Sequence, residues 1–141
     1  MMQVKIADNI DDVRRRVGKK GEELSASIKK ALSITAQAGI NIIEARTSKG
    51  KGFKGGSFKK YTPLYAAFRN SRGRGARPDL QFTGQMLSAM TSRASQSQAE
   101  IFFSRATESK KAAMNNKTRP FFGFSAKEQK QLGEVFFKAL K

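Results

Sequence analysis

A segment free of acidic residues sets the strongest limit on how this chain can fold. Between Ser48 and Pro78 the sequence holds nine Lys or Arg residues, six Gly residues and not one Asp or Glu. Like charges repel one another and glycine resists ordering, so a segment of this kind cannot form a hydrophobic core by itself. We therefore expect residues 48–78 to be a basic, Gly-rich loop region that is either solvated or lies against a negatively charged partner.

The remaining composition is that of a globular protein. The chain has 141 residues, 38% of them hydrophobic and 28% charged, which fits a single domain over residues 1–141. The net charge is +17, and +9 of it comes from the basic loop region. A positive field concentrated in under a quarter of the chain attracts polyanions, which are either nucleic acid or an acidic protein face.

The residue types that are missing argue against an enzyme. The sequence contains neither Cys nor His, so thiolate and imidazole metal sites and nucleophiles activated by His are excluded. The eleven carboxylates form no tight acidic cluster, and a catalytic pairing of Asp79 with Glu100 has no support in the sequence. We predict no catalytic residue, no cofactor and no metal.

One glycine motif has the letters of a nucleotide-binding fingerprint. Residues 50–55 read Gly-Lys-Gly-Phe-Lys-Gly, which is GxGxxG. The dinucleotide fingerprint needs a strand before it and a helix that starts within it. Here the sequence predicts a long helix before the motif and more loop after it. We therefore interpret these glycines as loop residues.

Hydrophobic spacing predicts a helix toward each end of the chain. Apolar or small residues recur every three or four positions and indicate a long helix from about Glu22 to Arg46. Ser125 and Glu128 form a capping box that opens a final helix. The residues expected to face the core are Leu24, Ile28, Leu32, Thr35, Ala38 and Ile42 in the long helix, Leu132, Val135, Phe136, Ala139 and Leu140 in the final helix, and Ile10, Val13 and Val17 in a helical turn before Gly18.

Shorter patterns predict a small sheet and further short helices. Residues 3–6 alternate polar and apolar side chains, and residues 91–104 are typical of a β-hairpin with Ser97-Gln98 at its turn. The other expected helical segments are residues 63–70, opened by a Thr62-Pro63 cap, residues 83–90, and residues 107–115, with Ala112, Ala113 and Met114 on the apolar side. The prediction is an α+β fold, in which a long N-terminal helix and a C-terminal helix pack on a small, mainly antiparallel sheet, with long basic loops.

The candidate binding residues are basic side chains of the loop region. We expect them to contact DNA or an acidic partner surface, because neutralising a polyanion takes several cations. A solvated, flexible face is the alternative. Their pattern indicates no recognition helix that reads bases. The candidates are Lys49, Lys51, Lys54, Lys59, Lys60, Arg72, Arg74 and Arg77.

The aromatic residues fall into two groups. Those that alternate with lysine are expected either to contact a partner or to anchor the loop on the domain, and these are Phe53, Phe58, Tyr61 and Phe68. The phenylalanines of the C-terminal third form apolar runs, which favours core packing. A run of Arg119, Pro120, Phe121 and Phe122 precedes the capped final helix, and we expect it to form a rigid platform for assembly.

The order of several short motifs resembles the tailed-phage virion morphogenesis proteins, also called tail-completion or head–tail joining proteins. The resemblance covers nearly the whole chain, apart from its first 20 residues. The pieces that carry it are residues 42–47 (Ile-Ile-Glu-Ala-Arg-Thr), residues 52–62, residues 64–66 (Leu-Tyr-Ala), residues 78–80 (Pro-Asp-Leu), Thr83-Gly84 with Met86-Leu87, and residues 119–124 (Arg-Pro-Phe-Phe-Gly-Phe).

This resemblance implies a structural role without catalysis, at the neck or the head-proximal end of a phage tail. It implies a homo-oligomeric ring around the DNA channel, expected to be a hexamer, with connector or neck proteins and tail tube or tail terminator proteins as neighbours. The sequence shows no apolar run near the ~20 residues of a membrane span and no signal-peptide pattern, so we expect assembly in the host cytoplasm and a place in the virion. The alternative is a stand-alone nucleic-acid-binding protein without sequence specificity.

Overall fold

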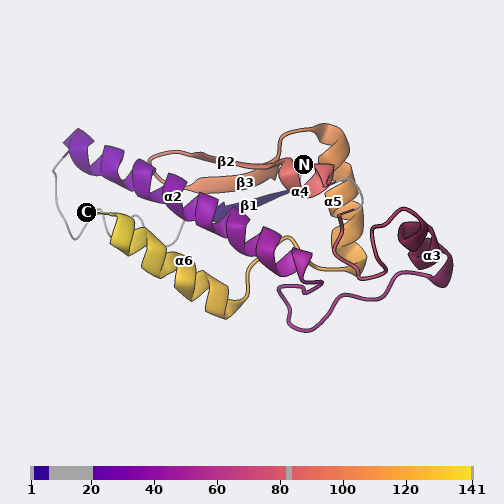
Figure 1. Ribbon diagram of the computed structural model, residues 1–141. Helices are drawn as coiled ribbons and strands as arrows, with labels where there is room; N and C mark the ends of the chain where they lie inside the picture. Colours follow the sequence, from indigo (N-terminus) through magenta and orange to yellow (C-terminus); the bar gives the residue numbers. More distant parts are fainter. Residues whose placement is uncertain (1, 7–20, 82–83, 141) are drawn as a thin grey trace.

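The computed structural model describes residues 2–6, 21–81 and 84–140 and has the expected α+β architecture (Figure 1). Within these residues there are three strands and five helices. They are β1 (Gln3–Ile6), α2 (Gly21–Ser48), α3 (Pro63–Ser71), α4 (Gln85–Ser88), β2 (Met90–Ala94), β3 (Ala99–Phe103), α5 (Ala106–Thr118) and α6 (Ala126–Ala139). The helical turn predicted around Ile10, Val13 and Val17 lies outside the described residues.

The sheet is antiparallel and has the strand order β1-β3-β2. Strands β2 and β3 form the predicted hairpin, and β1 pairs with the other edge of β3, with Gln3 opposite Phe102. Successive side chains of a strand point to opposite faces. In β3 this alternation buries Ala99, Ile101 and Phe103 completely on one face, which makes β3 the centre of the core.

Helix α2 lies across one face of the sheet, and α6 runs beside α2 (Figure 1). The predicted position of α2 is confirmed to within two residues at each end, but part of its predicted face is wrong. Ala38 and Ile42 are only half-buried, whereas Ile40 and Ile43 are buried. The buried face advances by about 3.6 residues per turn, so after Thr35 it passes to Ile40 and Ile43.

The final helix starts where the sequence predicts. The Ser125 hydroxyl accepts a hydrogen bond from the Glu128 N–H (3.2 Å), and the Glu128 carboxylate accepts one from the Ser125 N–H (2.9 Å), which completes the capping box. Leu132 and Phe136 are buried in α6. The capping box therefore fixes the point at which the chain turns from the aromatic run into α6.

Helix α5 covers the predicted residues but buries a different side. Ala112 is fully buried, whereas the side chain of Met114 is 71% exposed, so its predicted core position is wrong. Consecutive helix residues point about 100° apart and cannot share one face. The buried side of α5 is instead formed by Glu108, Ser109 and Ala112.

Phenylalanines from β3 and from the stretch before α6 pack together. The ring centroid of Phe103 lies 5.0 Å from that of Phe122 and 6.4 Å from that of Phe121, and all three residues are buried. Such ring pairs contribute about 0.5–1.5 kcal/mol beyond the area they bury. The predicted core role is confirmed for these residues and for Phe136, but Phe137 is 58% exposed.

Candidate functional site: the basic arm and the cleft at its base

Residues 49–80, named here the basic arm, leave the end of α2 and carry α3 away from the rest of the molecule (Figure 1). The arm starts with a turn, because Gly50 has a φ of +74° and its carbonyl accepts a hydrogen bond from the Phe58 N–H (2.8 Å). Within the loop from Gly50 to Phe58, Lys51 and Ser57 form an isolated antiparallel β-bridge. The GxGxxG letters therefore lie in a small loop after a helix, as predicted, and not in a strand–turn–helix unit.

The first part of the arm is anchored by the aromatic run before α6. Arg119 donates hydrogen bonds to the carbonyls of Lys59 (2.7 Å) and Lys60 (3.1 Å), and the Pro120 carbonyl accepts one from the Phe53 N–H (3.2 Å). Gly52 and Pro120 are packed so closely that a side chain at position 52 would not fit, because a Cβ there would lie 2.6 Å from the Pro120 carbonyl oxygen. Within the chain, Arg119 and Pro120 thus hold the arm.

The other two residues of the predicted platform are part of the core. Phe121 and Phe122 are buried, and their N–H groups both donate to the Asn116 side-chain oxygen at 3.0 Å. The Phe121 carbonyl accepts a hydrogen bond from Arg46 (2.7 Å). One side of the run therefore binds the arm while the other is fixed in the core.

Aromatic residues of the arm act mainly as anchors. Phe58 is buried at 6% exposure and belongs to the hydrophobic core. Phe53 packs on Gly123, where a Cβ would lie 2.8 Å from the ring, and Arg46 lies 5.9 Å from its centroid. Phe68 differs, because it is 43% exposed. Of the two roles that the sequence left open, anchoring holds for Phe53 and Phe58.

Arg69 is the one basic residue of the arm that is buried. Its guanidinium donates to the carbonyl of Gly75 (2.9 Å) and to the carboxylate of Asp79 (2.9 Å), and it lies 4.9 Å from the Tyr61 ring centroid. These contacts fold the Gly/Arg loop after α3 back onto the helix. Asp79 is thereby engaged with Arg69, while Glu100 is paired with Arg93, so the two carboxylates do not form a catalytic pair.

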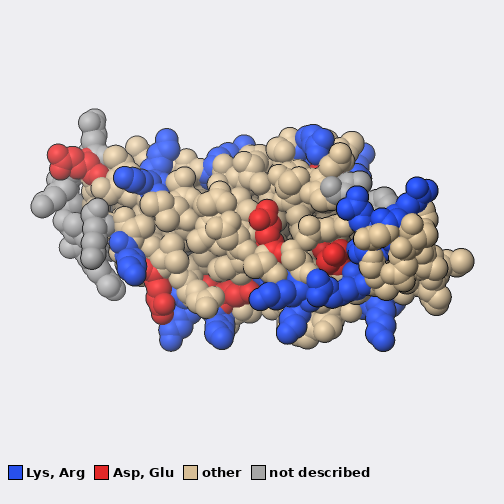
Figure 2. Space-filling model, viewed as in Figure 1, with Lys and Arg blue, Asp and Glu red and all other residues tan. Residues whose placement is uncertain are grey.

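The eight predicted contact residues are all exposed. They are Lys49, Lys51, Lys54, Lys59, Lys60, Arg72, Arg74 and Arg77. Figure 2 shows basic side chains spread over this face, including the end that carries the arm, whereas acidic side chains are fewer. Because the eight basic side chains lie at the surface, their positive charge attracts a negatively charged partner.

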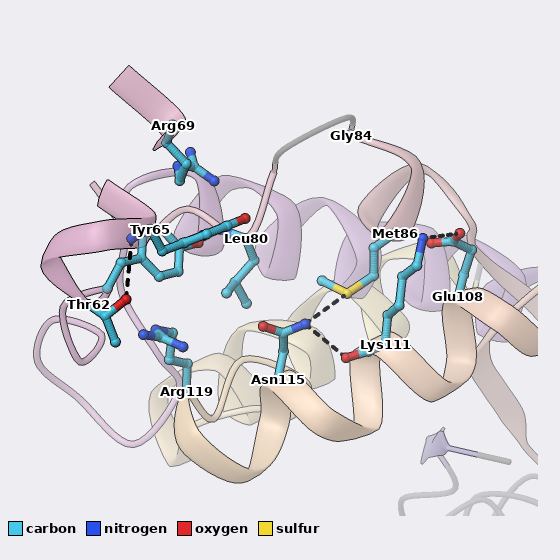
Figure 3. A pocket seen from close by; sticks show the side chains of 11 residues that line it. Thr62, Tyr65, Arg69, Leu80, Gly84, Met86, Glu108, Lys111, Asn115 and Arg119 are labelled. Atoms are coloured by element: carbon cyan, nitrogen blue, oxygen red, sulfur yellow. Dashed lines mark hydrogen bonds and ion pairs between the residues drawn. The ribbon is translucent and has the colours of Figure 1, made fainter. Parts of the chain in front are cut away.

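A cleft of about 480 Å³ lies between the arm and helices α4 and α5 (Figure 3). Its lining was not predicted, since no sequence pattern links residues so far apart along the chain. The arm contributes Tyr61, Thr62, Tyr65, Arg69 and Leu80, and the rest of the molecule contributes Gly84, Met86, Glu108, Lys111, Asn115 and Arg119.

The cleft has both polar and apolar walls, and its charged groups are engaged within the chain. The Tyr61 ring lies between two guanidinium groups, 4.9 Å from Arg69 and 4.6 Å from Arg119. Burial raises the pKa of the Tyr61 phenol above its ordinary value of 10.0, although the Leu80 N–H, which donates to the phenol oxygen, opposes this shift. Glu108 is buried and accepts a hydrogen bond from Lys111 (3.1 Å). Around the cleft, cation–π and hydrogen-bond contacts therefore link the arm to the rest of the domain.

Three negative findings bear on the class of site. Among the described residues, no group of three or more acidic side chains lies close enough together to hold a metal ion. No helix in the same part of the chain is long and apolar enough to cross a membrane. Comparisons with known protein families, with curated proteins and with solved structures find no match for this chain. The geometry itself thus gives the functional information, and it describes an anchored, positively charged arm.

Proposed function

We propose that this protein is a structural component of tailed-phage particles that joins tail to head at the neck or the head-proximal end of the tail. The observation that carries the proposal is the basic arm, whose eight cations are exposed while Phe53, Phe58 and the backbone at Lys59 and Lys60 are anchored on the domain. An exposed group of positive charges serves binding, because it raises the local concentration and the association rate of negatively charged partners.

Two of the motifs that resemble the virion morphogenesis proteins meet in space, which supports the proposal. Residues 52–62 form the first part of the arm, and residues 119–124 form the run that anchors it, through Arg119 and Pro120. The two motifs together hold one projecting arm on the domain. A projecting arm fits an assembly protein, because it reaches a neighbouring protein in the particle.

We further propose that several copies form a closed ring around the DNA channel, with a hexamer as the expected form. A repeated contact that closes on itself limits growth to a defined number of copies. The packed helices α2 and α6 each carry an exposed apolar side chain, Ile34 at 44% and Phe137 at 58%, and we propose these two helices as the elements that contact neighbouring copies. The arm then remains available for DNA or for connector, neck and tail proteins.

The test is a charge reversal of the arm in a head–tail joining assay with purified heads and tails. We expect Lys54→Glu, Lys59→Glu, Lys60→Glu and Arg72→Glu together to abolish joining, because these exposed cations would repel the partner they now attract. The melting temperature should stay almost unchanged, since surface changes of this kind usually alter stability by no more than about 0.5 kcal/mol each.

The matched control reverses four exposed lysines outside the arm, which are Lys110, Lys117, Lys127 and Lys130. This variant changes the net charge by the same amount and should still join heads to tails. Intact joining by the arm variant, or equal loss in both variants, would contradict the proposal.

The alternative of a stand-alone nucleic-acid-binding protein gives a different result in solution. It predicts a monomer that binds duplex DNA tightly, with an affinity that falls steeply as salt is raised. The proposed joining protein instead forms a ring, or remains a monomer that binds DNA weakly and still joins heads to tails. Sedimentation and DNA titration across a salt series separate these two outcomes.

A further inference from the structure

Helix α3 is oriented with its charged residue inside and its leucine outside. Arg69 is its only fully buried residue, whereas Leu64 is 87% exposed. In a self-contained domain the apolar face of an amphipathic helix turns to the core and the charged face to water. Helix α3 reverses this order and sits on the projecting arm (Figure 1). Its outer face therefore has the composition of a surface that another molecule covers.

The exposed apolar side chains form one stripe along α3. Leu64 and Phe68 are four residues apart and so lie one above the other on the same face of the helix, and Phe68 is 43% exposed. Tyr65 borders the stripe, since its ring centroid lies 6.2 Å from that of Phe68, and it lines the cleft, where it packs edge-on against Tyr61 at 4.9 Å. A stripe with this spacing fits the apolar face of a second helix.

The charges around this stripe decide what kind of partner fits. The arm has exposed cations on both sides of α3 in the sequence, Lys59 and Lys60 before it and Arg72, Arg74 and Arg77 after it. The only acidic residue of the arm, Asp79, is engaged with Arg69. A partner helix that brings carboxylates to this rim gains electrostatic attraction as well as apolar contact.

The same charges argue against the two simpler occupants. A second copy carries a net charge of +17, and among its described residues Asp79, Glu100, Glu108 and Glu128 are already paired with its own Arg or Lys. Double-stranded DNA offers phosphates to the cations, but its backbone offers no apolar surface for Leu64 and Phe68. An acidic, amphipathic protein segment satisfies both features.

We propose that the outer face of α3 docks on an acidic amphipathic helix of a different protein chain. The inference rests on the proposed role of the arm as a docking element and names the chemistry of its partner. Leu64 and Phe68 supply the buried contact, and the flanking cations pair with carboxylates at the rim. Within the particle, this assigns the tip of the arm to an acidic protein face and not to the DNA.

The inference is tested by binding of the full-length chain to three fluorescent probes, measured by anisotropy. The first is an amphipathic helical peptide built from Glu and Leu, the second is poly-L-glutamate of equal charge, and the third is a short duplex DNA. The test variant is Leu64→Ser with Phe68→Ser. The matched control is Met114→Ser, which removes an equally exposed apolar side chain from α5, outside the arm.

We expect the natural chain to bind the peptide more tightly than poly-L-glutamate. The double variant should weaken peptide binding by about tenfold or more, because it loses the apolar contact, and change DNA binding by no more than about twofold. The Met114→Ser control and a conservative Leu64→Met variant should bind the peptide as the natural chain does.

Equal affinity for the peptide and poly-L-glutamate would overturn the inference, as would unchanged peptide binding by the double variant or a parallel loss of DNA binding. Circular dichroism and the melting temperature report whether the double variant keeps its fold. If it does not, Leu64→Ser alone, at a position that is 87% exposed, takes its place, and unchanged peptide binding by that variant would overturn the inference. The peptide result stands apart from the head–tail joining assay. Loss of joining in the charge-reversed arm, together with no effect of Leu64 and Phe68 on peptide binding, would leave the proposed function standing and reject this inference alone.

Discussion

Arg69 donates a hydrogen bond from Nη2 to the Asp79 carboxylate over 2.9 Å, and this buried pair closes the basic arm upon itself. The Arg69 side chain is 1% exposed, and it also donates to the carbonyls of Arg74 (3.3 Å) and Gly75 (2.9 Å). Arg69 thus binds both to its charged partner and to the backbone of the loop. This one side chain explains how the Gly/Arg loop after α3 takes a defined shape without a hydrophobic core of its own.

Replacement of Arg69 by Met should open the arm without unfolding the domain. The change leaves Asp79 and two carbonyls without their donor. We therefore expect the free energy needed to open the arm to fall by about 2–4 kcal/mol. Limited trypsin digestion should then cut faster at Arg72 and Arg74, while the melting temperature changes little because no other helix packs extensively on α3. The control is Arg72→Met, an exposed residue of the same arm, which should leave the remaining cuts at their natural rate. Equal digestion of Arg69→Met and the natural chain would show that the pair does not hold the arm.

Two glycine-to-alanine changes should have opposite effects on stability. A Cβ at Gly52 would meet the Pro120 carbonyl oxygen at 2.6 Å, so Gly52→Ala has to displace backbone and should cost about 1–3 kcal/mol. Gly133 lies within α6, where an added Cβ would meet open space, so Gly133→Ala should stabilise by about 0.5–1 kcal/mol. Urea unfolding midpoints measure both. A Gly52→Ala protein as stable as the natural chain would contradict the tight contact between the arm and Pro120.

The buried phenol of Tyr61 should make stability depend on alkaline pH. Burial raises its pKa above 10.0, so the folded protein holds the proton more tightly than the unfolded chain does. The resulting stability is fully present below pH 10.0 and is lost as pH rises through the higher pKa of the folded state. The chain has two Tyr and no Trp, so phenolate absorbance is easily followed. The difference between the natural chain and Tyr61→Phe should titrate with a midpoint above 10.0, and a midpoint at or below that value would reject the burial of this group.

Arg46 should not be replaceable by lysine. Its guanidinium contacts the Glu128 carboxylate (3.1 Å) and the carbonyls of Phe121 (2.7 Å) and Gly123 (2.9 Å), which joins α2 to the start of α6. The single ammonium group of lysine cannot reproduce the contacts that the planar, two-pronged guanidinium makes. Arg46→Lys should therefore lower the free energy of unfolding by about 2–3 kcal/mol.

The matched control is Arg93→Lys, whose pair with Glu100 has a 64% exposed arginine side chain and is expected to contribute only about 0–1 kcal/mol. Urea unfolding compares the two variants under one set of conditions. Equal shifts of the two midpoints would contradict the role assigned to Arg46.

Local signals in the sequence predicted most of the fold. The capping box at Ser125, the Thr62-Pro63 cap and the alternation of β3 depend on neighbouring residues, so one sequence is enough to find them. The errors concern helix faces. Met114 was grouped with Ala112 as a run of apolar letters, although their spacing places them on different sides of α5.

The site was predictable only in part. Exposure of the eight cations follows from their charge alone. Arg69 is an arginine like Arg72, Arg74 and Arg77, and nothing next to it in the sequence marks it as buried. Its burial depends on Asp79, ten residues later. The cleft joins residues from Tyr61 to Arg119 and has no local signal. The exposure of Leu64 also has no signal in the sequence, since a hydrophobic residue after a helix cap normally predicts core packing.

The central claim is that an arm with exposed positive charge serves the assembly of a phage particle. The most direct measurement is to locate the chain in finished virions by cryo-electron microscopy, with mass spectrometry of the same particles. The proposal predicts a closed ring of this chain at the junction of head and tail, with α3 against a neighbouring protein. Finished virions that lack the chain would contradict it.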